Sequence, residues 1–159
     1  MSDHTMSRRT VLLGAAAAMA AVPMRLKAAS GPAIHVLRDP GCGCCGAWME
    51  VLQRDGFEVT SDEVENDVLA AAKLSRGVPE EMMSCHTGDV EGYVIEGHVP
   101  PADIRRLLAE RPDAVGLTVP GMPYGSPGMG PEDQREAYAV HLIRRDGMTE
   151  IFTQYDAAA

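Results

Sequence analysis

Basic residues, long apolar runs and cysteines are all scarce in this sequence. Lys and Arg number 14 against 23 Asp and Glu, which argues against binding to nucleic acid or anionic lipid because both require a basic protein surface. The apolar stretch at 14–22 is shorter than the roughly 20 residues that a membrane-spanning helix needs. We therefore expect neither a nucleic-acid-binding protein nor a retained membrane anchor.

The four cysteines are distributed very unevenly. Cys42, Cys44 and Cys45 lie within four positions, and Cys85 follows much later, in the segment Met-Met-Ser-Cys-His. A simple structural disulfide does not need three thiols in so short a segment. Thiolates at this density, with methionine and histidine beside them, form a soft donor set that selects Cu(I), zinc or an iron–sulfur cluster.

The N-terminal segment is typical of a twin-arginine export signal. Arg8 and Arg9 precede the short apolar run, and small residues at 28–30 offer a cleavage region. The hypothesis is that residues 1–29 are a signal peptide and that residues 30–159 form one mature domain in the periplasm, with no membrane attachment after cleavage. Residues 1–29 hold four Lys or Arg and one Asp, so the mature chain keeps 10 basic and 22 acidic residues, a net charge of −12. This balance suits a soluble protein that meets cations.

Several uses of the cysteines stay open at this point. In an oxidising compartment four cysteines usually indicate two disulfides, but a bond between the adjacent Cys44 and Cys45 would close a strained ring. Pairing Cys42 with Cys45 would form a Cys-x-x-Cys redox motif and would leave Cys44 and Cys85 over. Zinc could bind four thiolates, but export and the surrounding methionines favour copper.

The pattern of apolar and turn residues predicts alternating strands and helices. We expect strands at 34–37, 57–60 and 93–96, a helix from the cysteine motif to Gly56, helices over 62–76 and from Pro101 to before Pro112, and a hairpin over 138–155. Residues 113–131 are dense in Gly and Pro and are expected to be a loop.

This order predicts an α/β, thioredoxin-like domain in which helices flank a central mixed sheet and a β-hairpin ends the chain. The cysteine motif would open the first helix. Unpaired backbone N–H groups and the helix dipole at that end lower the pKa of a thiol, which favours metal binding or thiol exchange.

Four segments together resemble the CopG-type copper-resistance proteins, long catalogued as a domain of unknown function. The segments are 39–45 (Asp-Pro-Gly-Cys-Gly-Cys-Cys), 83–87 (Met-Ser-Cys-His-Thr), 92–100 and 119–129, and the resemblance covers roughly residues 33–155. It implies a periplasmic thioredoxin-like domain that holds a cysteine-bridged multinuclear copper cluster. It also implies a role in copper resistance, through interconversion of Cu(I) and Cu(II).

Imidazole and thioether ligands could complete such a site. His86, beside Cys85, is the best imidazole candidate, and His98 could either bind metal or hydrogen-bond a loop. Met122 and Met129 could be soft ligands, although methionine also fills gaps in loops. The predicted metal ligands are Cys42, Cys44, Cys45, Cys85, His86, His98 and Met129.

Other conspicuous side chains have simpler explanations. His35 and His141 lie in predicted strands and are expected to be structural or surface groups. Trp48 and Tyr93 are expected to lie in the core.

The sequence therefore leads to two functional hypotheses. The first is a copper-binding protein that holds Cu(I) and could act as a copper oxidoreductase. Its partners would be copper ions and periplasmic copper-handling or electron-transfer proteins. The alternative is a periplasmic thiol–disulfide oxidoreductase that uses the Cys-x-Cys-Cys motif. A dithiol enzyme would leave the additional Cys, His and Met residues unused, so their surplus favours the metal.

The export hypothesis gives a direct prediction. Replacing Arg8 and Arg9 by Lys-Lys should leave unprocessed precursor in the cytoplasm, because the arginine pair is an address read by the export machinery. Fractionation followed by immunoblotting measures this, and normal export of the variant would contradict the twin-arginine assignment.

Overall fold

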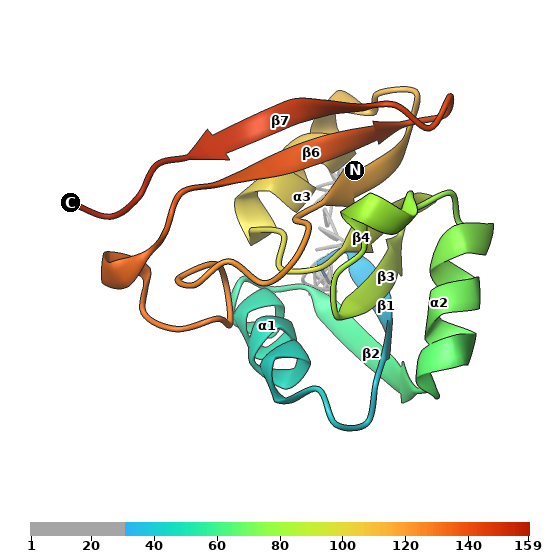
Figure 1. Ribbon diagram of the computed structural model, residues 1–159, viewed down its shortest axis with the longest axis horizontal. Helices are drawn as coiled ribbons and strands as arrows, with labels where there is room; N and C mark the ends of the chain where they lie inside the picture. The colour runs from blue at the N-terminus through green and yellow to red at the C-terminus, as the bar shows by residue number, and fades with distance from the viewer. Residues whose placement is uncertain (1–30) are drawn as a thin grey trace, which may run out of the picture.

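A seven-stranded mixed sheet flanked by three α-helices makes up the structure, which the computed structural model describes for residues 31–159 (Figure 1). The strand order is β2-β1-β3-β4-β5-β6-β7. The α/β class and the mixed sheet predicted from the sequence are confirmed. The predicted signal peptide at 1–29 lies outside the described residues.

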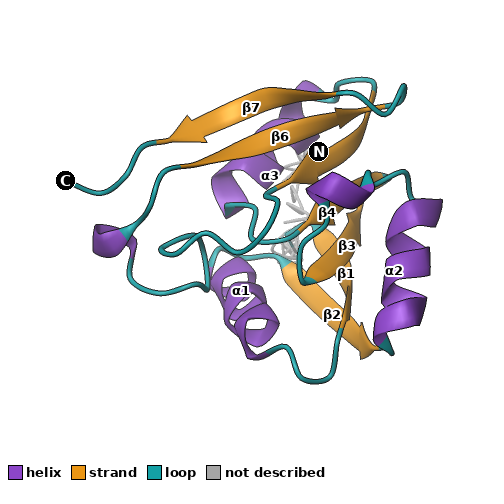
Figure 2. Cartoon of the chain, in the orientation of Figure 1, coloured by secondary structure: helices purple, strands orange, loops and turns teal. Residues whose placement is uncertain are grey.

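Helices and strands alternate along most of the chain (Figure 2). The strands are β1 (Ala33–Arg38), β2 (Glu58–Glu63), β3 (His86–Val90), β4 (Tyr93–Glu96), β5 (Ala114–Thr118), β6 (Tyr138–Arg144) and β7 (Thr149–Tyr155). The helices are α1 (Gly43–Arg54), α2 (Asn66–Ser75) and α3 (Pro101–Glu110), with short 3-10 helices at Glu80–Met82 and Glu132–Gln134. Most predicted elements, including the C-terminal hairpin β6–β7, are confirmed.

Three details of the predicted secondary structure are wrong. Strand β3 was not predicted, and β5 lies inside the segment 113–131 that was expected to be a loop. Gly116 explains the second error, because a Cβ there would lie 1.8 Å from the carbonyl oxygen of Val94, so the strand pairing requires a glycine that resembles a loop residue in the sequence. Asp62 belongs to β2, and the second helix begins only at Asn66.

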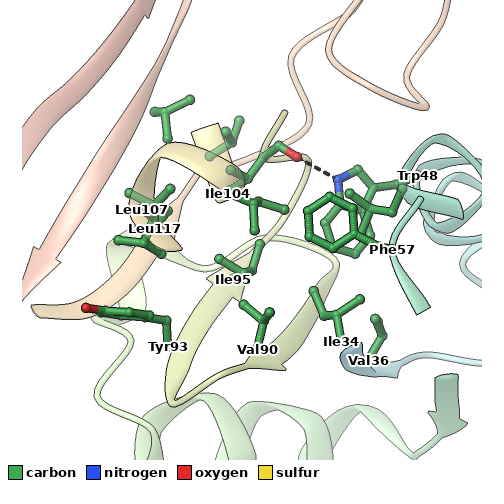
Figure 3. Packing of buried hydrophobic residues seen from close by; sticks show 14 of the residues in the cluster. Ile34, Val36, Trp48, Phe57, Val90, Tyr93, Ile95, Ile104, Leu107 and Leu117 are labelled. Atoms are coloured by element: carbon green, nitrogen blue, oxygen red, sulfur yellow. Dashed lines mark hydrogen bonds between the residues drawn. The ribbon is translucent and has the colours of Figure 1, made fainter. Parts of the chain in front are cut away.

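The main hydrophobic core lies between the sheet and helices α1 and α3 (Figure 3). Its buried side chains come from both helices and from the central strands, and include Ile34, Trp48, Ile95, Ile104, Leu107 and Leu117. The Trp48 indole N–H donates a hydrogen bond of 2.9 Å to the Val99 carbonyl, which joins α1 to the segment before α3. Trp48 and Tyr93 are both buried, as predicted.

The opposite face of the sheet carries helix α2 (Figure 1) and a smaller buried cluster of Val78, Val94 and Ile143. Val94 and Ile95 are neighbours in β4 and belong to different clusters, as the alternation of side chains along a strand requires. The sheet therefore has helices packed on both faces.

The strand directions bring four loops together at one edge of the sheet. Strands β1 and β4 each pair antiparallel with β3, and β5 pairs parallel with β4, so β1, β4 and β5 end where β3 begins. The register pairs Arg38 with His86, Thr87 with Glu96, and Glu96 with Thr118. All the predicted metal ligands lie in the loops at this edge or in the first residues of α1 and β3. Within 31–159 no helix is both long and apolar enough to cross a bilayer.

Candidate metal centre

The four cysteine sulfurs converge at this edge of the sheet. Cys42 immediately precedes α1, Cys44 and Cys45 lie in its first turn, and Cys85 immediately precedes β3. The four sulfurs all lie within 4.8 Å of one another. Cys42 and Cys45 form a disulfide with Cα atoms 5.5 Å apart, and Cys44 and Cys85 are free thiols.

The two free thiols, Cys44 and Cys85, connect the cysteines of α1 with the segment before β3. The Cys44 sulfur lies 3.5 Å from the Cys42 sulfur and 3.8 Å from the Cys85 sulfur. The Cys45 sulfur lies 3.9 Å from the backbone carbonyl of Cys85. The first turn of α1 contains no acidic residue, so no carboxylate in that turn competes with the sulfurs for a cation. Reduction of the disulfide would therefore present four sulfurs to one soft metal site.

Two imidazoles contact the Cys85 sulfur, one from the first residue of β3 and one from the segment between β4 and α3. His98 Nε2 lies 3.2 Å and His86 Nδ1 lies 3.3 Å from this sulfur. The ligand atoms of Cys85, His86 and His98 lie within 4.8 Å of one another. Cys85 belongs both to this group and to the four-cysteine group, so its sulfur is the point where thiolate and imidazole donors meet.

The hydrogen bond on the other side of His98 fixes its tautomer. His98 Nδ1 lies 2.8 Å from the Pro127 carbonyl oxygen, which can only accept, so Nδ1 carries the proton. Nε2 therefore presents its lone pair to the Cys85 sulfur, which is the arrangement common among metal-binding histidines.

His86 is held by packing rather than by a second hydrogen bond. Its ring lies 4.3 Å from the Trp48 ring and 5.2 Å from the His98 ring, measured between centroids. Its Nε2 atom is buried and has no hydrogen-bond partner among residues 31–159. The sequence ranked His86 above His98 as a ligand. In the structure, however, only the His98 ring is oriented by a hydrogen bond that leaves its other nitrogen free to bind a metal. The core residue Trp48 orients both rings, through the tilted contact of its ring with His86 and its hydrogen bond to Val99, the neighbour of His98.

The surroundings keep both imidazoles neutral and keep Cys85 protonated. Burial lowers the pKa of His86 well below its ordinary value, and the nearby His98 and Lys73 lower it further. Burial likewise lowers the pKa of His98. Burial and the adjacent Cys44 raise the pKa of the Cys85 thiol to about 12. Neutral imidazole is the form that binds metals, and a metal at Cys85 would have to displace a proton.

Met122 rather than Met129 contacts the cysteines. The Met122 sulfur lies 3.9 Å from the Cys44 sulfur, and 53% of the residue is exposed. Met129 lies in the same loop and donates its backbone N–H to the Ser126 carbonyl. No sulfur contact joins Met129 to a cysteine in the part of the chain that the structure describes, and its role as a ligand stays a prediction.

The remaining histidines lie apart from the site. His35 belongs to β1 and lies 2.9 Å from the Thr60 hydroxyl and 3.3 Å from an Asp62 carboxylate oxygen. His141 belongs to β6. Both occupy strands, as expected from the sequence.

Comparison with known proteins agrees with this geometry. Residues 82–129 match the family described as "Protein of unknown function, DUF411". Two solved structures named copper resistance protein copG are similar to this chain over 79% of its length and 98% of theirs. Form 1 is 46% identical with a TM-score of 0.73, and form 2 is 49% identical with a TM-score of 0.72. The chain belongs to the CopG copper-resistance family.

The resemblance stated from the sequence is therefore confirmed. A search of curated proteins gave no match. The CopG match spans nearly all of the described residues, and the family match at 82–129 includes Cys85, both buried histidines and both methionines of the loop. Together with the sulfur cluster, family membership supports a role in copper resistance.

The buried imidazoles predict that the metal-free, reduced protein loses stability in acid. The folded-state pKa values of His86 and His98 are lowered, so below about pH 6.5 the unfolded chain binds protons that the native state does not. Their contribution is complete above that pH and falls by up to about 1.4 kcal/mol per pH unit for each histidine as the pH decreases towards the folded values. Melting temperatures measured between pH 5 and 7 should show a smaller slope for His86→Leu than for the parent. Equal slopes would contradict the prediction.

Proposed function

We propose that this protein is a periplasmic copper-binding protein of copper resistance, in which Cys42, Cys44, Cys45 and Cys85 hold more than one Cu(I). The observation that carries the proposal is the convergence of four sulfurs within 4.8 Å, with two imidazoles directed at one of them. Thiolates bind Cu(I) in preference to harder ions. A cluster of four thiolates on one helix turn and one opposing loop can bridge several soft ions.

The ligand set fits copper better than zinc. A structural zinc site would use four donors in a closed tetrahedron. Here His86, His98 and Met122 also lie within reach of the cysteine sulfurs, so the donors outnumber those a single zinc needs. In the proposed site Cys85 is the bridging ligand, His98 the principal imidazole ligand, and Met122 an additional sulfur donor on the exposed side.

The mixture of donors supports interconversion of Cu(I) and Cu(II). Sulfur favours Cu(I), whereas imidazole nitrogen also suits Cu(II). Each conversion moves one electron per copper, which a periplasmic electron-transfer or copper-handling partner would supply or accept. The role of the imidazoles in this proposal is to keep the oxidised ion bound while the thiolates hold the reduced ion.

The thioredoxin-like assignment also belongs to this proposal. The parallel β1–α1–β2 unit with cysteines at the start of α1, followed by the antiparallel pair β3–β4 and then α3, supports it. On this assignment β5, the 119–131 loop and the β6–β7 hairpin extend the domain, and the loop adds Met122 and the carbonyl that orients His98.

The Cys42–Cys45 disulfide favours a second candidate function, thiol–disulfide exchange. The Cys44 thiol lies beside this disulfide, and Cys85 lies beside Cys44, so a resolving thiol is available. In that function the Cys42–Cys45 disulfide would oxidise a substrate dithiol and become a dithiol itself, or the reduced pair would reduce a substrate disulfide, in either case without metal. Copper binding by the reduced form separates the two candidates.

Copper titration of the reduced protein tests the main proposal. We expect the parent to bind more than one Cu(I) per chain, to protect all four cysteines from alkylation and to melt at a higher temperature with copper, because ligands assembled only in the native state convert binding energy into stability. Cys85→Ala should lose most of this binding, since it removes the sulfur that lies between Cys44 and the two imidazoles.

Met129→Leu is the matched control, because it changes a methionine of the same loop that has no contact with a cysteine sulfur. It should bind copper as the parent does. If copper left the melting temperature and thiol alkylation of the parent unchanged, the protein would not be a copper-binding protein, and the thiol–disulfide alternative would stand.

The two imidazoles should affect copper redox chemistry more than copper content. His98→Ala and His86→Ala are expected to retain much of the Cu(I) but to shift its reduction potential and slow its re-oxidation by air. The shift should be larger for His98→Ala, whose lone pair is oriented by the Pro127 carbonyl. Voltammetry of the copper-loaded variants measures it, and parental potentials in both would leave a thiolate copper store without redox function.

A further inference from the structure

A buried ion pair lies beside the metal centre without contacting it. Lys73, in the last turn of α2, is 2% exposed, and Glu96, the last residue of β4, is fully buried. Lys73 Nζ lies 2.6 Å from Glu96 Oε1. Lys and Glu are rarely buried so completely, and such a pair is often no more stabilising than apolar residues of similar volume. Its presence here calls for a role other than stability.

Both members of the pair bond to the backbone of a single residue, Ser84. Lys73 Nζ donates to the Ser84 carbonyl at 2.6 Å, and Ser84 N–H donates to Glu96 Oε1 at 2.7 Å. The Ser84 carbonyl is thus held by a positive charge, and the Ser84 N–H is held by a negative one. Ser84 immediately precedes Cys85, and its segment is not part of a strand, so no sheet ladder fixes these groups instead.

Ser84 also connects this pair to the loop that carries Met122. The Ser84 hydroxyl donates to the Gly121 carbonyl. A Cβ on Gly97 would lie 2.6 Å from the Ser84 side chain and 2.6 Å from the Val119 carbonyl oxygen, so the three segments are in close contact. The position of Ser84 therefore sets the position of Cys85 relative to both the β4–α3 segment and the Met122 loop.

Attachment of α2 to the sheet does not require Lys73. Arg76, at the C-terminal end of the same helix, makes three hydrogen bonds, of 3.0, 3.1 and 2.8 Å, to the Asp89 carboxylate on β3. The Arg76–Asp89 pair joins α2 to β3, the strand that begins directly after Cys85. No hydrogen bond joins either member to Ser84 within residues 31–159. This pair supplies a natural comparison for the Lys73–Glu96 pair.

We propose that Lys73 and Glu96 are positioning residues of the metal centre, which act through Ser84 to hold the Cys85 sulfur between Cys44 and His98. The inference rests on the proposed copper-binding function and concerns the geometry of the same site. Charged partners suit this role because hydrogen bonds to charged groups are shorter and stronger than neutral ones. The pair thus holds a loop residue as firmly as a strand would.

Replacing both charges by apolar residues tests the proposal. In Lys73→Met/Glu96→Met the packing volume is nearly kept and no unpaired charge is left, but the Ser84 N–H and carbonyl lose their partners, so the metal-free protein should melt somewhat below the parent and still fold. Its weakest-bound Cu(I) should nevertheless lose at least roughly tenfold in affinity, about 1.4 kcal/mol. The thiolate-to-copper absorption and the copper reduction potential should also change.

Arg76→Met/Asp89→Leu is the matched control and should retain parental copper affinity, absorption and potential even where it melts lower. If the Lys73→Met/Glu96→Met protein kept the parental affinity and spectrum, the positioning role would be disproved. If the parent and the control bound no copper at all, the proposed function itself would fail, so the two failures are distinguishable.

Glu96→Gln provides a second test that does not depend on folding of the double variant. Glutamine keeps the Oε1 acceptor for Ser84 N–H and for Lys73 but removes the counter-charge of a buried ammonium, so this variant should melt lower and yet hold copper within about threefold of the parent, a difference well below the tenfold step of 1.4 kcal/mol. A tenfold loss in Glu96→Gln would overturn the argument, because the acceptor would then not be what positions Cys85.

Discussion

The position of one sulfur atom, that of Cys85, is the constraint on which the site depends. Cys42, Cys44 and Cys45 belong to one continuous segment and come together whenever α1 forms. Cys85 comes from the segment before β3, and among the described residues its sulfur alone lies within 4 Å of both a second cysteine sulfur and two imidazoles. The antiparallel pairing of β1 with β3 brings it there, since Arg38, four residues before Cys42, is the register partner of His86, which follows Cys85. The sheet topology therefore creates the site.

Much of this arrangement could be predicted from local sequence, and the remainder depends on tertiary contacts. The cysteine motif at a helix start, the helix after Pro101 and the final hairpin carry their own capping, proline and turn signals, so their prediction succeeded. Strand β3 has the sequence His-Thr-Gly-Asp-Val, and β5 contains Gly116; neither has the apolar alternation of a strand, because both are central and are stabilised by their neighbours. The preference for Met122 over Met129 depends on the path of a loop, and the tautomer of His98 depends on a carbonyl 29 residues away. Periodicity cannot supply such information.

Burial sets the protonation states of the side chains at the metal-free site. Both imidazoles are neutral because burial disfavours their charged forms, and Cys85 is a neutral thiol for the same reason. Without metal, the residues at the centre thus bury little net charge, which limits the desolvation cost of folding. A soft cation that enters would replace the thiol proton and supply the positive charge that makes a buried thiolate stable. In the proposed site, the burial that raises the pKa of the Cys85 thiol would therefore also make its thiolate form depend on a bound cation.

Fold stability and ligand geometry are joined through a few shared residues. Trp48 is fully buried in the core, yet its ring contacts His86, and its N–H holds Val99 beside His98. Gly128 lies so close to the middle of the same helix that a Cβ would be 2.5 Å from the Trp48 backbone nitrogen, which places the Met122 loop directly against α1. A change in the packing of Trp48 would consequently move both imidazoles and the loop together. This coupling explains how a site built from four separate segments can have a defined geometry before any metal binds: Trp48 fixes the segments of His86, His98 and the Met122 loop to the core, and the buried pair of Lys73 and Glu96 fixes Ser84 beside Cys85.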